Sequence, residues 1–194
     1  MPIRTDKLEK YFDAGLLHEA IELITEIQAR DANMYEAELS EVRDISFQLQ
    51  EIPEESVADF NMLYAWVQSY RSRISTILYN IHSDKATWKN YKYRVAQLYR
   101  KGKNKILTIR EDIVALRNKE LQEAAVQEEL GMLVDIQELI KYRLEFLDDA
   151  MTMIAIKRDE ITSADMDLSR QQRVVEILQG IGYPLRGQHV LPRS

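Results

Sequence analysis

The chain contains no cysteine and very little glycine or proline. Without thiols it can form no disulfide, no thiolate nucleophile and no Cys-ligated zinc site. Six Gly and four Pro among 194 residues are too few for the many turns of an all-β fold. The glycines are also scattered, so no Gly-rich loop is available to hold a phosphate group. These absences predict a mostly helical protein and exclude several classes of enzyme.

Histidine is almost as scarce, with His18, His82 and His189 far apart in the sequence. No Glu-x-x-His or His-Glu-x-x-His element occurs, so the sequence predicts no di-iron site, no zinc site and no cofactor. A pair of carboxylates is the one catalytic arrangement still open, and no motif points to it. The chain is therefore expected not to be an enzyme.

Long apolar runs are absent as well. No stretch approaches the 18 uninterrupted apolar residues of a membrane span, and charged residues interrupt the first ten positions. We therefore expect no membrane association and a location in the cytoplasm, which would be the host cytoplasm for a phage protein.

The apolar residues that are present recur at spacings of three and four. Over 6–29 they predict one helix or a short helical hairpin, with a possible interruption at 13–15. A more polar helix is expected over 32–50, followed by a linker at 51–56, because Pro53 disfavours helix at Ile52. Ser56 is the predicted N-cap of the next helix.

Two long apolar seams follow, over 60–98 and 133–161, and only Asp84 breaks the first one. Such seams predict an all-α fold built on a long coiled-coil-like hairpin, which we expect to turn at Gly102. A helix of about 60 Å needs partner helices, so we also predict a homo-oligomer. The predicted segments are an acidic helical segment at 1–52, a DNA-binding and oligomerisation domain at 53–179 and a flexible tail at 180–194. The residues expected to hold the oligomer together are Ile140, Leu144, Leu147, Met151 and Ile154.

Charge is distributed in blocks along the chain. Residues 1–56 carry a net charge of −9, residues 57–110 carry +9, residues 111–168 carry −9 and residues 169–194 carry +3. A basic block between two acidic ones indicates either a surface that binds polyanions or a set of helices that neutralise one another.

The basic block also contains aromatic residues, and this combination is typical of proteins that bind single-stranded nucleic acid without sequence preference. Positive side chains contact the phosphates in such proteins, and aromatic rings stack on the bases. Helical geometry places Trp88 and Tyr91 on the seam, and therefore in the core, and leaves Tyr93 and Tyr99 off it. The predicted nucleic-acid-binding residues are Lys85, Lys89, Lys92, Tyr93, Arg94, Tyr99, Arg100, Lys101, Lys103 and Lys105.

Part of this pattern resembles the recombination mediator proteins of T-even-like phages, the UvsY family. The similarity lies in Asn61-Met62-Leu63-Tyr64, Trp66, Lys92-Tyr93-Arg94, Tyr99 and Gly102, and in the run 140–161 with Leu144-Glu145-Phe146-Leu147-Asp148 and Ala150. It covers roughly residues 60–165. The acidic N-terminal block, the longer spacing from Arg94 to Gly102 and the longer tail depart from the family pattern.

The resemblance implies a ring-like homo-oligomer that binds single-stranded DNA, displaces or remodels single-strand-binding protein and loads a RecA-type recombinase. Lys92 and Arg94 would then contact the DNA. Two alternatives remain: a virion-assembly or DNA-packaging subunit, which would prefer duplex DNA, and a structural coiled-coil scaffold with no affinity for nucleic acid.

Overall fold

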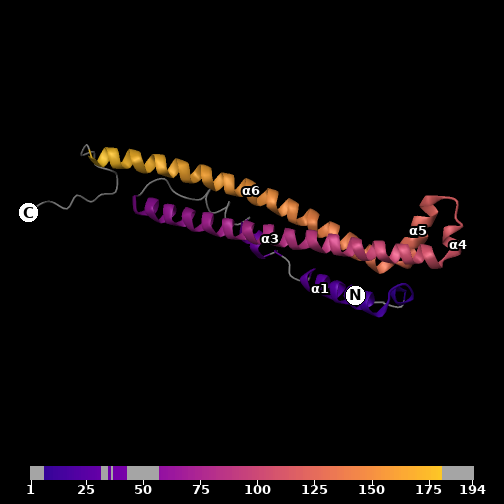
Figure 1. Cartoon of the computed structure of the whole chain (residues 1–194). Helices are drawn as coiled ribbons and strands as arrows, with labels where there is room; N and C mark the ends of the chain where they lie inside the picture. Colours follow the sequence, from indigo (N-terminus) through magenta and orange to yellow (C-terminus); the bar gives the residue numbers. More distant parts are fainter. Residues whose placement is uncertain (1–6, 32–34, 36, 43–56, 181–194) are drawn as a thin grey trace, which may run out of the picture. The chain divides into compact units, whose positions relative to one another are not determined.

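The computed structural model describes residues 7–31, 35, 37–42 and 57–180, and every regular element in these ranges is a helix (Figure 1). The predicted all-α helical hairpin is confirmed. The predicted linker at 51–56, the Ser56 cap and the tail beyond Gly180 lie outside the described residues. Of the predicted helix over 32–50, residues 37–42 are described, and they are helical. The other helices are η1 (Leu8–Lys10), α1 (Ala14–Asp31), α3 (Val57–Ile109), α4 (Glu111–Val114), α5 (Lys119–Glu129) and α6 (Gly131–Gly180).

The chain divides into two compact units. Unit 1 consists of Met1–Met34 and His82–Asp148, and unit 2 consists of Tyr35–Ile81 and Asp149–Ser194. The long helices α3 and α6 contribute residues to both units. The N-terminal helix α1 thus belongs to the same unit as the middle of the chain, and the predicted segments 1–52, 53–179 and 180–194 stay a prediction.

The interruption predicted at 13–15 is the start of α1. The Asp13 carboxylate accepts a 2.8 Å hydrogen bond from the backbone N–H of Leu16, which satisfies one of the free donors at the helix start. The four apolar residues at the centre of the helix are fully buried. They are Ala20, Leu23, Ile24 and Ile27.

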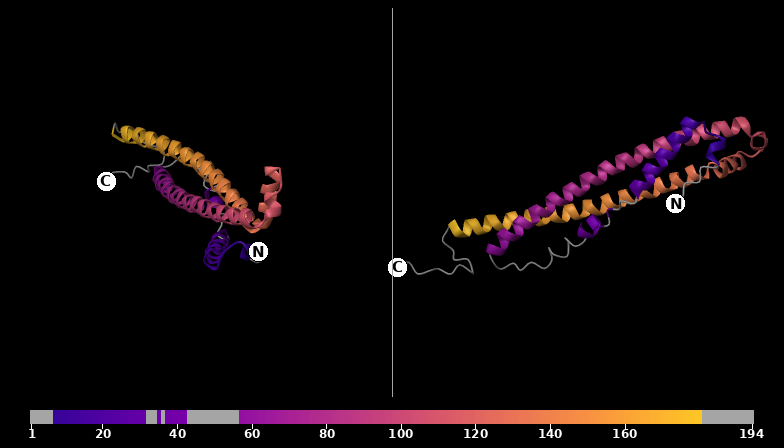
Figure 2. Two further views of the ribbon diagram at one scale, coloured as in Figure 1. Left: turned by 45° about the vertical axis from the view of Figure 1, so that its right-hand side comes forward. Right: turned by 90° about the horizontal axis from the view of Figure 1, so that it is seen from below.

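Within unit 1, α3 and α6 run antiparallel, and the views of Figure 2 agree with this course. The two apolar seams bury one another: Trp88 and Leu98 of α3 are at most 3% exposed, and so is Ile140 of α6. In unit 2 the same helices bury Ile74 and Ile161. The partner that the long seam requires is therefore supplied by the same chain.

This pairing removes the reason for which we predicted an oligomer. Ile140, Leu147 and Ile154 are buried within a single chain, and Leu144 and Met151 are half-buried. The prediction of an oligomer stays a prediction. If the oligomer forms, it has to use other surfaces than this seam.

The predicted turn at Gly102 is wrong, because α3 continues through Gly102 to Ile109. The glycine allows two side chains to pack closely against α3. A Cβ atom at this position would lie 2.8 Å from Cε1 of Phe12 and 3.0 Å from Cδ2 of Leu130. Only a residue without a side chain leaves room for these two buried groups.

The hairpin reverses instead through α4 and α5. Asn118 caps α5 by accepting a 2.8 Å hydrogen bond from the N–H of Glu120. The side-chain amide of Gln122 donates to the carbonyl oxygens of Val114 and Leu116, at 3.0 and 2.7 Å. These bonds fix the acidic stretch around α5 against the turn, so its role is to close the end of the hairpin.

Candidate nucleic-acid interface

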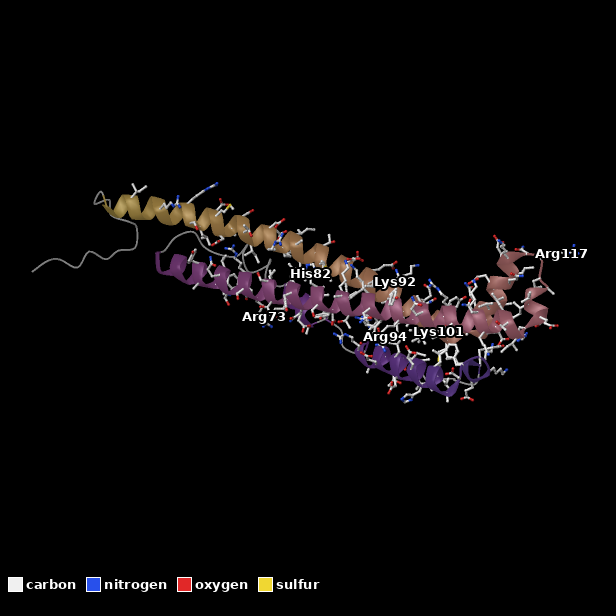
Figure 3. All side chains as sticks on the ribbon, in the orientation of Figure 1. Arg73, His82, Lys92, Arg94, Lys101 and Arg117 are labelled. Carbon is white, nitrogen blue, oxygen red and sulfur yellow. The ribbon has the colours of Figure 1, made fainter. Side chains whose placement is uncertain are left out.

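The predicted nucleic-acid-binding residues all lie on one uninterrupted stretch of α3, and they point in three directions. Lys85 to Lys105 spans just under six helical turns. One side of this stretch faces α1, a second side faces α5 and α6, and a third faces away from all described elements (Figure 3).

Arg94 and Lys101 lie on the side of α3 that faces α1, as Figure 3 shows. Arg94 forms a 3.5 Å ion pair with Glu26, and Lys101 forms a 3.7 Å ion pair with Glu19. The Tyr91 hydroxyl also donates a 2.7 Å hydrogen bond to Glu26. The acidic N-terminal helix thus occupies two of the predicted DNA contacts.

On the second side, Lys85 pairs with Asp148 of α6, and Lys103 pairs with Glu123 of α5. Glu123 also accepts a 2.8 Å hydrogen bond from the Tyr99 hydroxyl. Burial, followed by this hydrogen bond, raises the pKa of Tyr99 above its ordinary value. Tyr99 is therefore half-buried and bonded to α5 through its hydroxyl group.

Four predicted residues are exposed and have no hydrogen bond or ion pair among the described residues: Lys89, Tyr93 and Arg100 on the third side, and Lys92 at the edge of that side toward α6. Tyr93 is 65% exposed. Lys89, Tyr93 and Arg100 lie at i, i+4 and i+11, so they share one helix face, and Lys92 lies beside it. We call these four residues the outer stripe. Lys105 is likewise exposed and unpaired, but about 140° around the helix from Arg100.

The ion pairs themselves are weak, and they do not hold α1 in place alone. Exposed pairs of this kind contribute about 0–1 kcal/mol each. The burial of Leu23, Ile24 and Ile27 contributes more, since each fully buried aliphatic side chain gives roughly 1.5–3 kcal/mol. Because α1 is docked by this apolar face, Arg94 and Lys101 stay close to its carboxylates, although both side chains remain partly exposed.

Two charged contacts at the end of α1 were missed at the level of sequence. Arg30 pairs with Asp84, the one residue that breaks the apolar seam of α3. Asp31 pairs with Arg143, which is 7% exposed and also donates a 2.8 Å hydrogen bond to the Asp31 carbonyl oxygen. A charged residue inside an apolar seam was the available signal, because such a group is stable there only with a partner.

No group of three or more potential metal ligands occurs in the described ranges. His18 lies beside Glu22 at 3.1 Å, His82 is exposed, and His189 is outside the described residues. Among the helices described, none has the length and apolar character needed to cross a membrane.

No family model, curated protein or solved structure matches this chain.

Proposed function

We propose that this protein is a non-enzymatic single-stranded-DNA-binding protein that acts as a recombination mediator. One observation carries the proposal: the outer stripe presents three cations and an exposed tyrosine on a rigid helix, with no partner among the described residues. Cations contact the phosphates and a tyrosine stacks on a base in sequence-independent binding to a single strand.

The outer stripe contains four of the ten residues that the sequence predicted to bind nucleic acid. Three phosphate contacts give a salt slope of roughly −2 per chain, at about −0.7 per contact. A single copy is therefore a weak binder, and several copies along one strand would add their contacts.

The remaining steps follow the resemblance to the phage mediators. In the proposal, bound DNA is taken from single-strand-binding protein and presented to a RecA-type recombinase. A ring-like homo-oligomer would align several outer stripes along the strand. The assembly would form through surfaces other than the seam between α3 and α6.

A structural scaffold is the second candidate, and the internal ion pairs favour it. Lys85, Arg94, Lys101 and Lys103 each meet a carboxylate of an acidic neighbour. Half of the eight cations between Lys85 and Lys105 thus have a role in holding the fold together.

Two matched double variants separate these candidates. Lys89→Ala with Lys92→Ala removes two cations of the outer stripe, and Arg94→Ala with Lys101→Ala removes two cations paired with α1. Fluorescence anisotropy with labelled single-stranded and duplex oligonucleotides at two salt concentrations measures the affinity. We expect the first variant to lose most of the single-strand affinity and the second to retain it.

Equal and unaltered binding in both variants would contradict the proposal. Absence of any binding by the wild-type chain would leave the scaffold as the better account, and a preference for duplex DNA would favour a packaging subunit.

A further inference from the structure

The register of the hairpin in unit 1 is fixed by two contacts. Lys85 of α3 pairs with Asp148 of α6. Seventeen residues further along α3, Gly102 packs against Leu130, which lies eighteen residues before Asp148. The two antiparallel helices therefore keep nearly the same register between these contacts.

Lys92 lies seven residues after Lys85 on α3, and Lys141 lies seven residues before Asp148 on the antiparallel α6. A step of seven residues returns to almost the same side of a helix, so both lysines lie on the flank of the hairpin that carries that pair. Both are exposed, and neither has an ion pair with any described residue. Figure 3 shows Lys92 on the α3 flank toward α6.

The charge pattern on this flank changes at Lys92. Lys85 and Lys103 each meet a carboxylate, supplied by Asp148 and Glu123. At the level of Lys92 the opposite helix supplies another lysine. Two cations at one level repel each other, and an anion with several oxygen atoms lowers that repulsion by contacting both.

Two carboxylates lie close to Lys141 along α6, and neither forms an ion pair with it. Glu138 and Glu145 are at i−3 and i+4 from Lys141, and both are exposed. No ion pair joins either of them to Lys141. The ammonium groups of Lys92 and Lys141 are therefore both available to an added anion.

We propose that Lys92 and Lys141 together form a phosphate-binding site that spans α3 and α6. This inference rests on the proposed function, because the ligand of the site is a phosphodiester group of the bound single strand. The site extends the outer stripe onto α6. The site also accepts a free polyphosphate of similar charge.

Lys141→Glu is the sharpest test, because it places a carboxylate opposite Lys92, as Asp148 is placed opposite Lys85. The melting temperature should change by only about 1–2 °C, because the new ion pair with Lys92 is offset by repulsion from Glu138 and Glu145 on the same helix. Affinity for a labelled oligothymidylate should fall by roughly tenfold at low salt, because a phosphate contact becomes a repulsion. The melting temperature of the wild-type chain should rise with added inorganic tripolyphosphate, and that rise should disappear in the variant.

Lys119→Glu is the matched control, since Lys119 is an exposed, unpaired lysine at the start of α5. It changes the net charge by the same amount and should not affect tripolyphosphate binding, while a carboxylate in the first turn of α5 should raise the melting temperature slightly. Lys141→Gln removes the charge without reversing it. The logarithm of its affinity for the oligothymidylate should therefore fall by about half as much as in Lys141→Glu.

The possible outcomes separate this inference from the proposed function. If the wild-type chain binds the oligonucleotide and Lys141→Glu weakens it no more than Lys119→Glu, the α6 site is overturned and the outer stripe stands. If no oligonucleotide binds, but tripolyphosphate raises the melting temperature only when both lysines are present, the proposed function fails and the site binds free polyphosphate. If tripolyphosphate raises the melting temperature of Lys141→Glu as much as that of the wild-type chain, Lys92 and Lys141 do not form one site.

Discussion

The hydroxyl group of Tyr99 on α3 donates a 2.8 Å hydrogen bond to the carboxylate of Glu123 on α5. Lys103 pairs with the same carboxylate from the next turn of α3. This arrangement assigns Tyr99 to the closed end of the hairpin, whereas Tyr93 stays exposed.

Removal of the Tyr99 hydroxyl should therefore affect stability and leave DNA binding unaltered. Tyr99→Phe keeps the ring and loses one hydrogen bond to a charged acceptor, so we expect the free energy of unfolding to fall by about 1–2 kcal/mol. Urea denaturation followed by circular dichroism measures this change. Equal stability of Tyr99→Phe and wild type would contradict the role assigned to the Glu123 contact.

Tyr93→Ala should have the opposite effects, leaving stability unaltered and weakening DNA binding. The side chain is 65% exposed and forms no contact that holds the fold, so the melting temperature should stay within about 1 °C of wild type. If a base stacks on the ring, single-strand affinity should fall by about 1–3 kcal/mol, with the salt slope unaltered. Anisotropy across a salt series tests both parts. Unchanged affinity would mean that binding, if present, is purely electrostatic.

Gly102→Ala should destabilise unit 1, although alanine is the better helix former by about 1 kcal/mol. The added methyl group would meet Phe12 at 2.8 Å and Leu130 at 3.0 Å, and overpacking of this kind costs about 1–3 kcal/mol. We expect a net loss of about 1 kcal/mol in the free energy of unfolding. Gly131→Ala is the control, because a Cβ atom there meets nothing within 4 Å, and it should be neutral or stabilising. A stabilising Gly102→Ala would contradict the packing role.

Acid should weaken the closed end of the hairpin. Hydrogen bonds from Lys103 and Tyr99 lower the pKa of Glu123, and a hydrogen bond from Arg110 lowers the pKa of Asp112 to about 2. Burial alone would raise the pKa of Glu129, but the hydrogen bonds from Tyr11 and Arg110 together outweigh it and lower the pKa.

A carboxyl group whose pKa is lower in the folded state stabilises the fold fully above its unfolded pKa, and this contribution is lost as the pH falls through the folded pKa. Stability should therefore be constant down to about pH 5 and decline from there toward pH 2. Urea midpoints measured at several pH values test the decline. In Glu123→Gln the decline should be shallower, and an equally steep decline would remove Glu123 from the explanation.

Much of the fold could be predicted from the sequence because the apolar spacing of a long helix is local information. The seam through Trp88 and Leu98 indicated a long helix, and the seam through Ile140 indicated a second one that could pair with it. The sequence could not say whether that partner belonged to the same chain, since both arrangements satisfy the same pattern.

The turn and the candidate site depended on contacts between distant residues. A glycine in a helical pattern has the same appearance whether it ends the helix or admits a neighbour, and at Gly102 the neighbour is Phe12, ninety residues earlier. The cations of α3 likewise look alike in sequence. Whether each one meets a carboxylate is decided by its direction from the helix, as Arg94 and Lys92 illustrate.

Unit 1 combines the first 34 residues with residues 82–148, and this division has a consequence for synthesis on the ribosome. Helix α1 is complete at Asp31, but one of its charged partners, Arg143, emerges 112 residues later. At about 5–20 residues per second, that interval lasts roughly 6–22 s. Arg94 of α3, the partner of Glu26, is synthesised earlier than Arg143, so α1 can meet α3 before it can meet α6, and unit 1 is completed in two stages.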